Sequence, residues 1–238
     1  MKKDKLRVYL IEILLFIVLF LALFVSNIVT RKILALILTI FSIITFKVIK
    51  KKSIKSIYKN QVVWLMVGFG VIYLTSFYLM GIFFGYYEAA AKFGISTLID
   101  FILPFTVIII ASEVIRKILL SQQKIKFSNA IVLIDMVLID LIIYIGVYNL
   151  SDFEDMLTVL GFIFFASVAC NLLYNYISIR FENKGIVIYR LMTGLFVYII
   201  PYIPDVYVFF RSFLRMVYPY IIYLVLEYTY AKTNKATA

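Results

Sequence analysis

The sequence contains no histidine, and Cys170 is the only cysteine among its 238 residues. A single cysteine forms neither an intrachain disulfide nor a cysteine-based metal site. The lack of histidine excludes imidazole bases, histidine-ligated zinc or haem, and metalloprotease motifs of the HExxH type. Intramembrane protease motifs of the GxGD and GxSG types and the phosphate-binding motif GxxxxGK[ST] are also absent. We therefore expect no metal, no cofactor and no catalytic residue in this chain.

Charged residues are scarce as well, at 16% of the chain, whereas 64% is hydrophobic and the mean hydropathy is +1.03. A soluble domain has about 45–50% apolar and about 25% charged residues, because its surface must cover its core. This composition excludes an ordinary soluble protein and predicts an integral protein of the cell membrane. The lipid bilayer is then its main partner. In such a protein the net charge of +11 reflects membrane topology rather than binding of nucleic acid.

Long apolar runs recur along the chain at the length of membrane-spanning helices, each of which needs about 20 largely apolar residues. We predict an all-α, polytopic helical bundle of about eight transmembrane helices. The expected spans are residues 9–28, 33–50, 62–84, 97–114, 129–147, 156–177, 185–202 and 206–228. No linker or low-complexity segment separates them. Residues 1–238 are therefore expected to form a single membrane domain.

Lysine and arginine are distributed unevenly between the segments that connect these spans. With the N-terminus inside, 19 of the 24 fall on the inner side, including Arg116, Lys117 and Arg190. The outer loops hold only Arg31, Lys32 and Lys92. Since cytoplasmic loops carry the excess of Lys and Arg, both termini are predicted to be cytoplasmic.

Charged side chains inside the expected spans are the main candidates for a binding site, because each must face protein, water or a partner. Asp100 and Arg211 have similar depths near the outer face, which allows them to pair. Asp140 and Arg215 both lie near the middle, and we predict that they are near neighbours. Arg211 and Arg215 are four residues apart and share one helix face. They form either an ion-pair seam that fixes helix order or a receptor for an anion or peptide carbonyl groups.

A supporting polar network is expected on spans five to seven. Asp135 and Arg190 both lie within about 10 Å of the inner face, at a rise of about 1.5 Å per residue. Span six carries a single polar stripe made of Ser167, Asn171, Asn175 and Ser178. The stripe indicates either hydrogen bonding between helices or the wall of a substrate pathway. Cys170, beside it, is interpreted as a packing residue.

The C-terminal segment 200–220 reads IPYIPDVYVFFRSFLRMVYPY, and its first two prolines predict a sharp turn at Pro201–Asp205. This segment and Gly161–Arg180 resemble the multi-span membrane region that precedes the protease domain in some Firmicutes signal peptidases I of the archaeal or endoplasmic-reticulum type. The resemblance covers most of the chain and implies docking of an exported precursor or anchoring of the protease. The family's catalytic Ser and its Lys or His partner belong to the protease domain, and no residue here matches that motif.

Two functions follow as alternatives. The first is a non-catalytic membrane module associated with protein secretion or signal-peptide processing, whose partner is an exported precursor or a secretion or protease subunit. The second is a small-solute or ion transporter that uses the intramembrane Asp–Arg pairs. A broken helix or an internal repeat at the membrane midplane would indicate a transporter. Pro104 and Pro219 are weak candidates for positions where a helix breaks.

Overall fold

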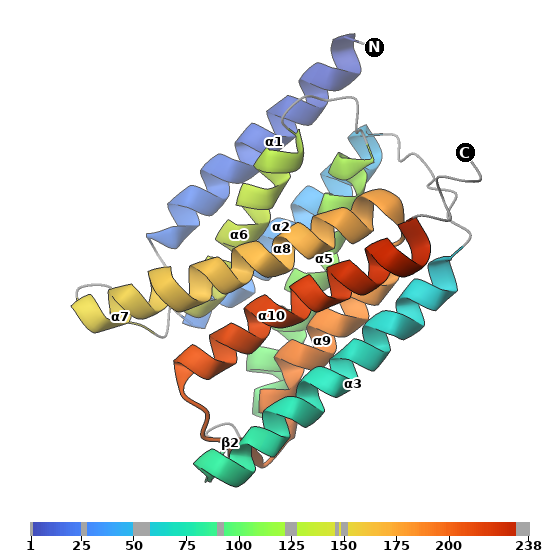
Figure 1. The fold of residues 1–238 in the computed structure, drawn as a ribbon. Helices are drawn as coiled ribbons and strands as arrows, with labels where there is room; N and C mark the ends of the chain where they lie inside the picture. Colours follow the sequence, from blue (N-terminus) through green and yellow to red (C-terminus); the bar gives the residue numbers. More distant parts are fainter. Residues whose placement is uncertain are drawn as a thin grey trace.

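A computed structural model of the chain describes residues 2–24, 28–49, 58–89, 93–121, 128–145, 148 and 152–231. Apart from one short two-stranded ribbon, the regular structure in these residues is helical (Figure 1), which confirms the all-α prediction. The α-helices are α1 (Lys2–Leu23), α2 (Ile28–Val48), α3 (Lys59–Phe84), α4 (Ile95–Thr97), α5 (Leu103–Leu120), α6 (Ser128–Ile145), α7 (Phe153–Thr158), α8 (Phe165–Arg180), α9 (Lys184–Ile199) and α10 (Val208–Leu226).

Three π-helical segments join or extend these helices. Segment η1 (Leu98–Ile102) links α4 to α5, η2 (Val159–Phe164) links α7 to α8, and η3 (Glu227–Ala231) extends α10. The described residues therefore form eight continuous helices. Pro104 lies in the first turn of α5, two residues after the end of η1, where the missing N–H of a proline is tolerated. The helix consequently continues through Pro104 without a break.

Within the described residues, five helices are long and apolar enough to cross a membrane. They are Leu6–Leu23, Lys59–Phe84, Ile95–Leu120, Phe153–Arg180 and Val208–Tyr230. The chain is accordingly an integral multi-pass membrane protein. The predicted count of about eight spans is not confirmed. Helix α9, for example, has 16 residues and measures about 24 Å, whereas the hydrocarbon core is about 30 Å thick.

The helices pack mainly on partners that are distant in the sequence, with α1 on α6, α2 on α5, α3 on α9 and α8 on α10 (Figure 1). Helices α1, α2, α5 and α6 bury one hydrophobic cluster, which includes Leu19, Leu38 and Ile115. Helices α3, α8, α9 and α10 bury a second cluster, which includes Met66 and Ile222. Contacts of α5 with α9 and of α6 with α8 join the two halves. The polar residues described below lie mainly at this junction.

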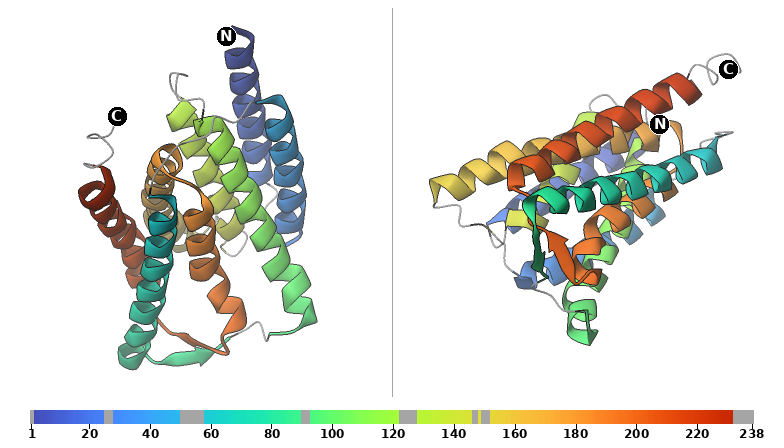
Figure 2. Two further views of the ribbon diagram at one scale, coloured as in Figure 1. Left: turned by 90° about the vertical axis from the view of Figure 1, so that its right-hand side faces the viewer. Right: turned by 60° about the horizontal axis from the view of Figure 1, so that its bottom comes forward.

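Strands β1 (Tyr86–Glu88) and β2 (Tyr202–Pro204) form the antiparallel ribbon, with Tyr86 opposite Pro204. The predicted sharp turn at Pro201–Asp205 is thus a short extended strand. Prolines are tolerated because each strand of a two-stranded ribbon has an unpaired edge. Gly85, with φ of 92°, turns the chain from α3 into β1. The end of the bundle that carries strands β1 and β2 is called the strand end. The start of α1 and the end of η3 lie toward the opposite end (Figure 2), which we call the basic end.

One helix extends beyond the expected span in a way that affects the site. The fourth span was expected to end at 114, but α5 continues to Leu120. Arg116 and Lys117, assigned to an inner loop by the sequence, are only 0% and 7% exposed. Several other predictions concern Val147, Lys50, Lys51, Lys52, Lys55, Lys92, Lys124, Lys126, Lys232 and Lys235, which lie outside the described residues.

Candidate functional site

A buried ion network connects α5, α6 and α9 at the junction of the two halves. Arg190 on α9 donates one hydrogen bond to Glu113 on α5, at 2.6 Å, and another to Asp140 on α6, at 2.8 Å. Glu113 is 1% exposed, Asp140 5% and Arg190 8%. Such charges remain in an apolar interior only if they are paired and hydrogen-bonded. One guanidinium therefore fixes the relative positions of three helices.

Asp140 also binds the polar stripe on α8. Its second oxygen, Oδ2, accepts hydrogen bonds from Ser167 Oγ at 2.8 Å and Asn171 Nδ2 at 2.7 Å. Asp140 and Arg215 interact electrostatically, in agreement with the prediction that they are near neighbours, but the ion pair of Asp140 is formed with Arg190. Similar depth was the basis of that prediction, but the cation that reaches Asp140 comes from α9 and not from α10. Arg215 does line the same small cavity as Asp140 and Arg190.

Arg116, which was not expected to be a site residue, completes this network. Its Nη1 donates to Asn175 Oδ1 and its Nη2 to Asn171 Oδ1, both at 2.6 Å. Its Nε lies 3.1 Å from Glu113 Oε2, within ion-pair distance but without hydrogen-bond geometry. The relevant sequence signal is the spacing of Glu113 and Arg116, which lie three residues apart on one face of an apolar helix.

The polar stripe of α8 contributes hydrogen bonds between helices. All four of its residues are buried. Asn175 donates to Asn129 Oδ1 on α6 at 2.9 Å, and Ser178 donates to Asn183 Oδ1 at 2.6 Å. The cavity beside Asp140 and Arg190 measures only about 30 Å³, which is enough for about one water molecule. These contacts favour the interpretation of the stripe as hydrogen bonding between helices over its interpretation as the wall of a substrate pathway.

Arg211 and Arg215 on α10 have a different environment. The Arg211 guanidinium lies over the ring of Phe77 on α3, at 5.4 Å, and that of Arg215 lies over the ring of Tyr144 on α6, at 5.1 Å. In the described parts of the chain neither arginine forms an ion pair with a carboxylate. The Nε of Arg211 is buried and has no hydrogen-bond partner. The rings of Phe77 and Tyr144, and not carboxylates, therefore contact the two guanidinium groups.

Cys170 supports the backbone beside Arg215. Pro219 lies inside α10 and has no N–H, so it cannot donate to the carbonyl of Arg215 four residues earlier. The thiol of Cys170 donates to that carbonyl oxygen at 3.3 Å. Cys170 is therefore a buried packing residue that also satisfies a backbone acceptor next to the arginine pair.

Two of the predicted acids lie away from these residues. Asp100 accepts hydrogen bonds from Lys32 at 2.6 Å and from Ser96 at 2.9 Å, so its predicted pairing with Arg211 is wrong. The side chain of Asp135 is completely buried, and neither of its oxygens has a hydrogen-bond partner. It interacts electrostatically with Glu12 on α1 and does not join Arg190. Since Asp135 and Asp140 are five residues apart, they face directions about 140° apart on α6.

Comparisons with known proteins do not identify the chain. No family model, no curated protein and no solved structure matches it. The side chains alone therefore indicate what the site can bind. In the described ranges, no group of three or more Cys, Asp or Glu residues could hold a metal ion.

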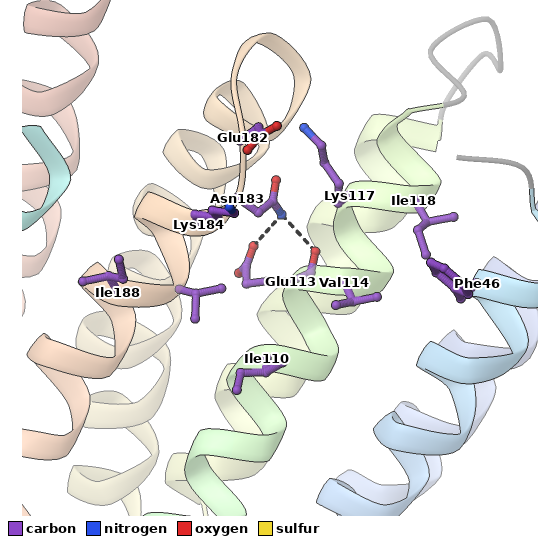
Figure 3. Close-up of a pocket in the computed structure, with 11 residues that line it drawn as sticks. Phe46, Ile110, Glu113, Val114, Lys117, Ile118, Glu182, Asn183, Lys184 and Ile188 are labelled. Atoms are coloured by element: carbon purple, nitrogen blue, oxygen red, sulfur yellow. Dashed lines mark hydrogen bonds between the residues drawn. The ribbon is translucent and has the colours of Figure 1, made fainter. Parts of the chain in front are cut away.

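The ion network also borders a cleft of about 860 Å³ near the basic end. Figure 3 shows Asn183 bonded to Glu113, with apolar side chains of α5 and α9 farther along the cleft. Asn183 Nδ2 donates to the Glu113 carbonyl at 2.9 Å and to Oε2 at 3.1 Å. The molecule thus combines a buried ion network, an arginine pair without an ion pair among the described residues, and a cleft that contains both polar and apolar groups.

Proposed function

We propose that the protein is a non-catalytic membrane module that binds a peptide or protein partner through Arg211 and Arg215. The main observation is that neither guanidinium forms an ion pair within 4.0 Å of a carboxylate among the described residues, although both lie within a candidate membrane span. A charge in this environment requires water, protein dipoles or a ligand. Arginine offers five donors in a fixed fork that suits peptide carbonyl and carboxylate groups.

The neighbouring residues support binding of a chain rather than transport of a solute. Exposed aromatic side chains border the arginines toward the strand end, where Tyr207 is 71% and Phe209 54% exposed. Aromatic residues and arginine are enriched where proteins bind each other. The cavity beside Arg215 is too small for a solute of several atoms, at about 30 Å³.

We further propose that all eight helices cross the cell membrane as one domain, residues 1–238, with both ends on the cytoplasmic side. The strand end, close to Arg211, then faces outward. The resemblance to the membrane region of archaeal-type signal peptidases I supports an exported precursor, or a secretion or protease subunit, as the partner. On this proposal the chain holds the partner near the outer face and cleaves nothing itself.

The test is photocrosslinking from an exposed position beside the arginines. A probe at Tyr207 is suitable, whereas Ser212 on the same helix is buried at 6% exposure. With a radiolabelled exported precursor in membranes, we expect a crosslink, no cleavage of the precursor, and loss of the crosslink in Arg215→Gln. A probe at exposed Tyr220, farther along α10, is the matched control and should give no crosslink.

Two results would contradict the proposal. Cleavage of the precursor by the purified chain would establish an enzyme. Concentrative uptake of a small solute into proteoliposomes, abolished by Arg215→Gln, would establish the transporter alternative.

A further inference from the structure

The cleft at the basic end has one polar end and one apolar wall. Lys117, Glu182, Asn183 and Lys184 lie at its polar end (Figure 3). Its wall consists of Phe46 from α2, Ile110, Val114 and Ile118 from α5, and Val187 and Ile188 from α9. A volume of about 860 Å³ is within the range of small-molecule sites. Its residues therefore suit a ligand with a polar head and a hydrocarbon tail.

The cleft is open along the side of the bundle. Phe46 is 65%, Ile110 46% and Ile188 36% exposed, so its apolar wall faces the surroundings of the helices. Ile110 lies ten residues before Leu120 at the basic end of α5, a distance of about 15 Å along the helix. This is half of the hydrocarbon thickness of about 30 Å. The wall is therefore as deep as one leaflet of the bilayer.

The polar end favours an anion. Helix α9 begins at the exposed Lys184, and the positive end of the helix dipole lies there. Lys117 keeps its ammonium group at the cleft by donating to the carbonyl oxygens of Ser178 and Phe181, at 3.0 and 2.6 Å.

The two acids at the cleft are already engaged by cations. Glu182 pairs with Lys59 at 2.9 Å and Glu113 with Arg190 at 2.6 Å. The remaining charge presented to a ligand is positive.

We propose that the cleft binds one anionic phospholipid from the leaflet at the basic end. Its phosphate lies beside Lys184 and Lys117, and one acyl chain lies against Ile110, Val114 and Ile188. The positive head site, the apolar wall and the depth of one leaflet match the three parts of such a lipid. A hydrophobic peptide segment matches the wall but supplies no phosphate. This inference is independent of the arginine pair on α10.

The test uses quenching of tryptophan fluorescence by brominated lipids. Trp64 is the only tryptophan, is 74% exposed on α3 and does not line the cleft. The double variant Trp64→Phe, Ile110→Trp moves the fluorophore into the cleft. It is reconstituted in vesicles of phosphatidylglycerol and phosphatidylcholine in which one lipid or the other is brominated. We expect brominated phosphatidylglycerol to quench at about a fivefold lower mole fraction, the ratio that one lysine near anionic lipid gives.

Lys184→Gln should reduce this preference to about one, whereas Lys47→Gln should keep it. Lys47 is also exposed near the basic end of α2 but does not line the cleft. The native Trp64 should show no preference between the two lipids. Equal quenching by both lipids at position 110 would overturn the proposal. Quenching of Trp64 without quenching at position 110 would also overturn the proposal. That result is expected if a peptide segment fills the cleft. If Ile110→Trp does not fold, Ile188→Trp provides the same measurement from α9.

Discussion

Asp135 and Asp140 illustrate at the residue scale how strongly the same side chain depends on its partners. Both are buried on α6, at 0% and 5% exposure. Asp140 accepts hydrogen bonds from Arg190, Ser167 and Asn171, whereas neither oxygen of Asp135 has a partner. Removing an acid that holds a buried cation is costly, while removing an unsatisfied polar group relieves a penalty. The two acids are therefore expected to respond to mutation in opposite directions.

Asp135→Val should stabilise the protein by about 1–3 kcal/mol, the usual penalty of an unsatisfied buried polar group. The measurement is thermal unfolding in detergent. Asp140→Val is the matched control on the same helix and should destabilise the protein, because it leaves Arg190 with Glu113 alone. A decrease in stability with Asp135→Val would mean that this carboxyl group has an essential partner.

Glu182 gives a prediction about pH. The hydrogen bond from Lys59 lowers the pKa of this carboxyl group below its ordinary value of 4.5. The pair therefore contributes to stability above pH 4.5, and the contribution disappears as the pH falls through the lower folded-state pKa. Because both side chains are partly exposed, the contribution is at most about 1 kcal/mol.

Glu182→Gln removes this contribution. Its stability difference from the wild type should be largest near neutral pH and should vanish in acid. Unfolding curves of the two proteins between neutral and acidic pH provide the measurement. A difference that grows as the pH falls would have the wrong sign.

Of the seven charged side chains buried in the described residues, the sequence pointed to Asp135, Asp140 and Arg190, but not to their partners. Sign and depth suggested Asp140 with Arg215 and Asp100 with Arg211, whereas the contacts are made by Arg190 and Lys32. The depth of a residue in its expected span gives its position along the bundle axis, but it does not show which helices are adjacent. Adjacency follows from the packing of α5 on both α6 and α9, which brings Arg190 to Asp140, and from the packing of α2 on α5, which brings Lys32 to Asp100.

At the scale of elements, each of the eight expected spans overlaps one of the eight helices in the described residues, and several helices extend beyond the expected spans. The helix that includes α5 runs to Leu120 and not to 114, because Arg116 and Lys117 are buried with partners on α8 and in the segment after it. A hydropathy pattern treats charged residues as the end of a span. Their burial becomes favourable through partners that the pattern does not show: Asn171 and Asn175 for Arg116, and backbone carbonyl oxygens for Lys117.

The contact between α5 and α9 depends on Gly194. A Cβ at this position would lie 2.4 Å from Cζ of Phe105, whose ring is buried on α5. Gly194→Ala should therefore separate the two helices and lower stability by about 1–3 kcal/mol, as overpacking does. Gly161→Ala is the control, since its Cβ would meet no atom within 4 Å. Thermal unfolding of both variants tests the contact, and equal stability would show that α5 and α9 do not pack this closely.

At the scale of the whole molecule, the proposed topology puts the strand end outside. Phe153 begins α7 and is 65% exposed. In a Cys170→Ser background, which keeps a donor for the carbonyl of Arg215, Phe153→Cys should react with an impermeant maleimide in intact cells. Lys184→Cys, at the basic end, should react only after permeabilisation. The reverse pattern would invert the proposed orientation.

We propose that the charged residues inside the bundle have two roles. The network around Arg190 holds the helices together, and the pair Arg211–Arg215 is available to a partner. The most direct test compares the free energies of unfolding of Arg190→Gln and Arg215→Gln in detergent. Arg190→Gln should lose about 3–5 kcal/mol, because it leaves Glu113 and Asp140 without their shared cation. Arg215→Gln should change stability by less than about 1 kcal/mol, because loss of its contact with Tyr144 is offset by removal of a charge without an acidic partner. Equal destabilisation by both substitutions would contradict the claim, since Arg215 would then be as structural as Arg190.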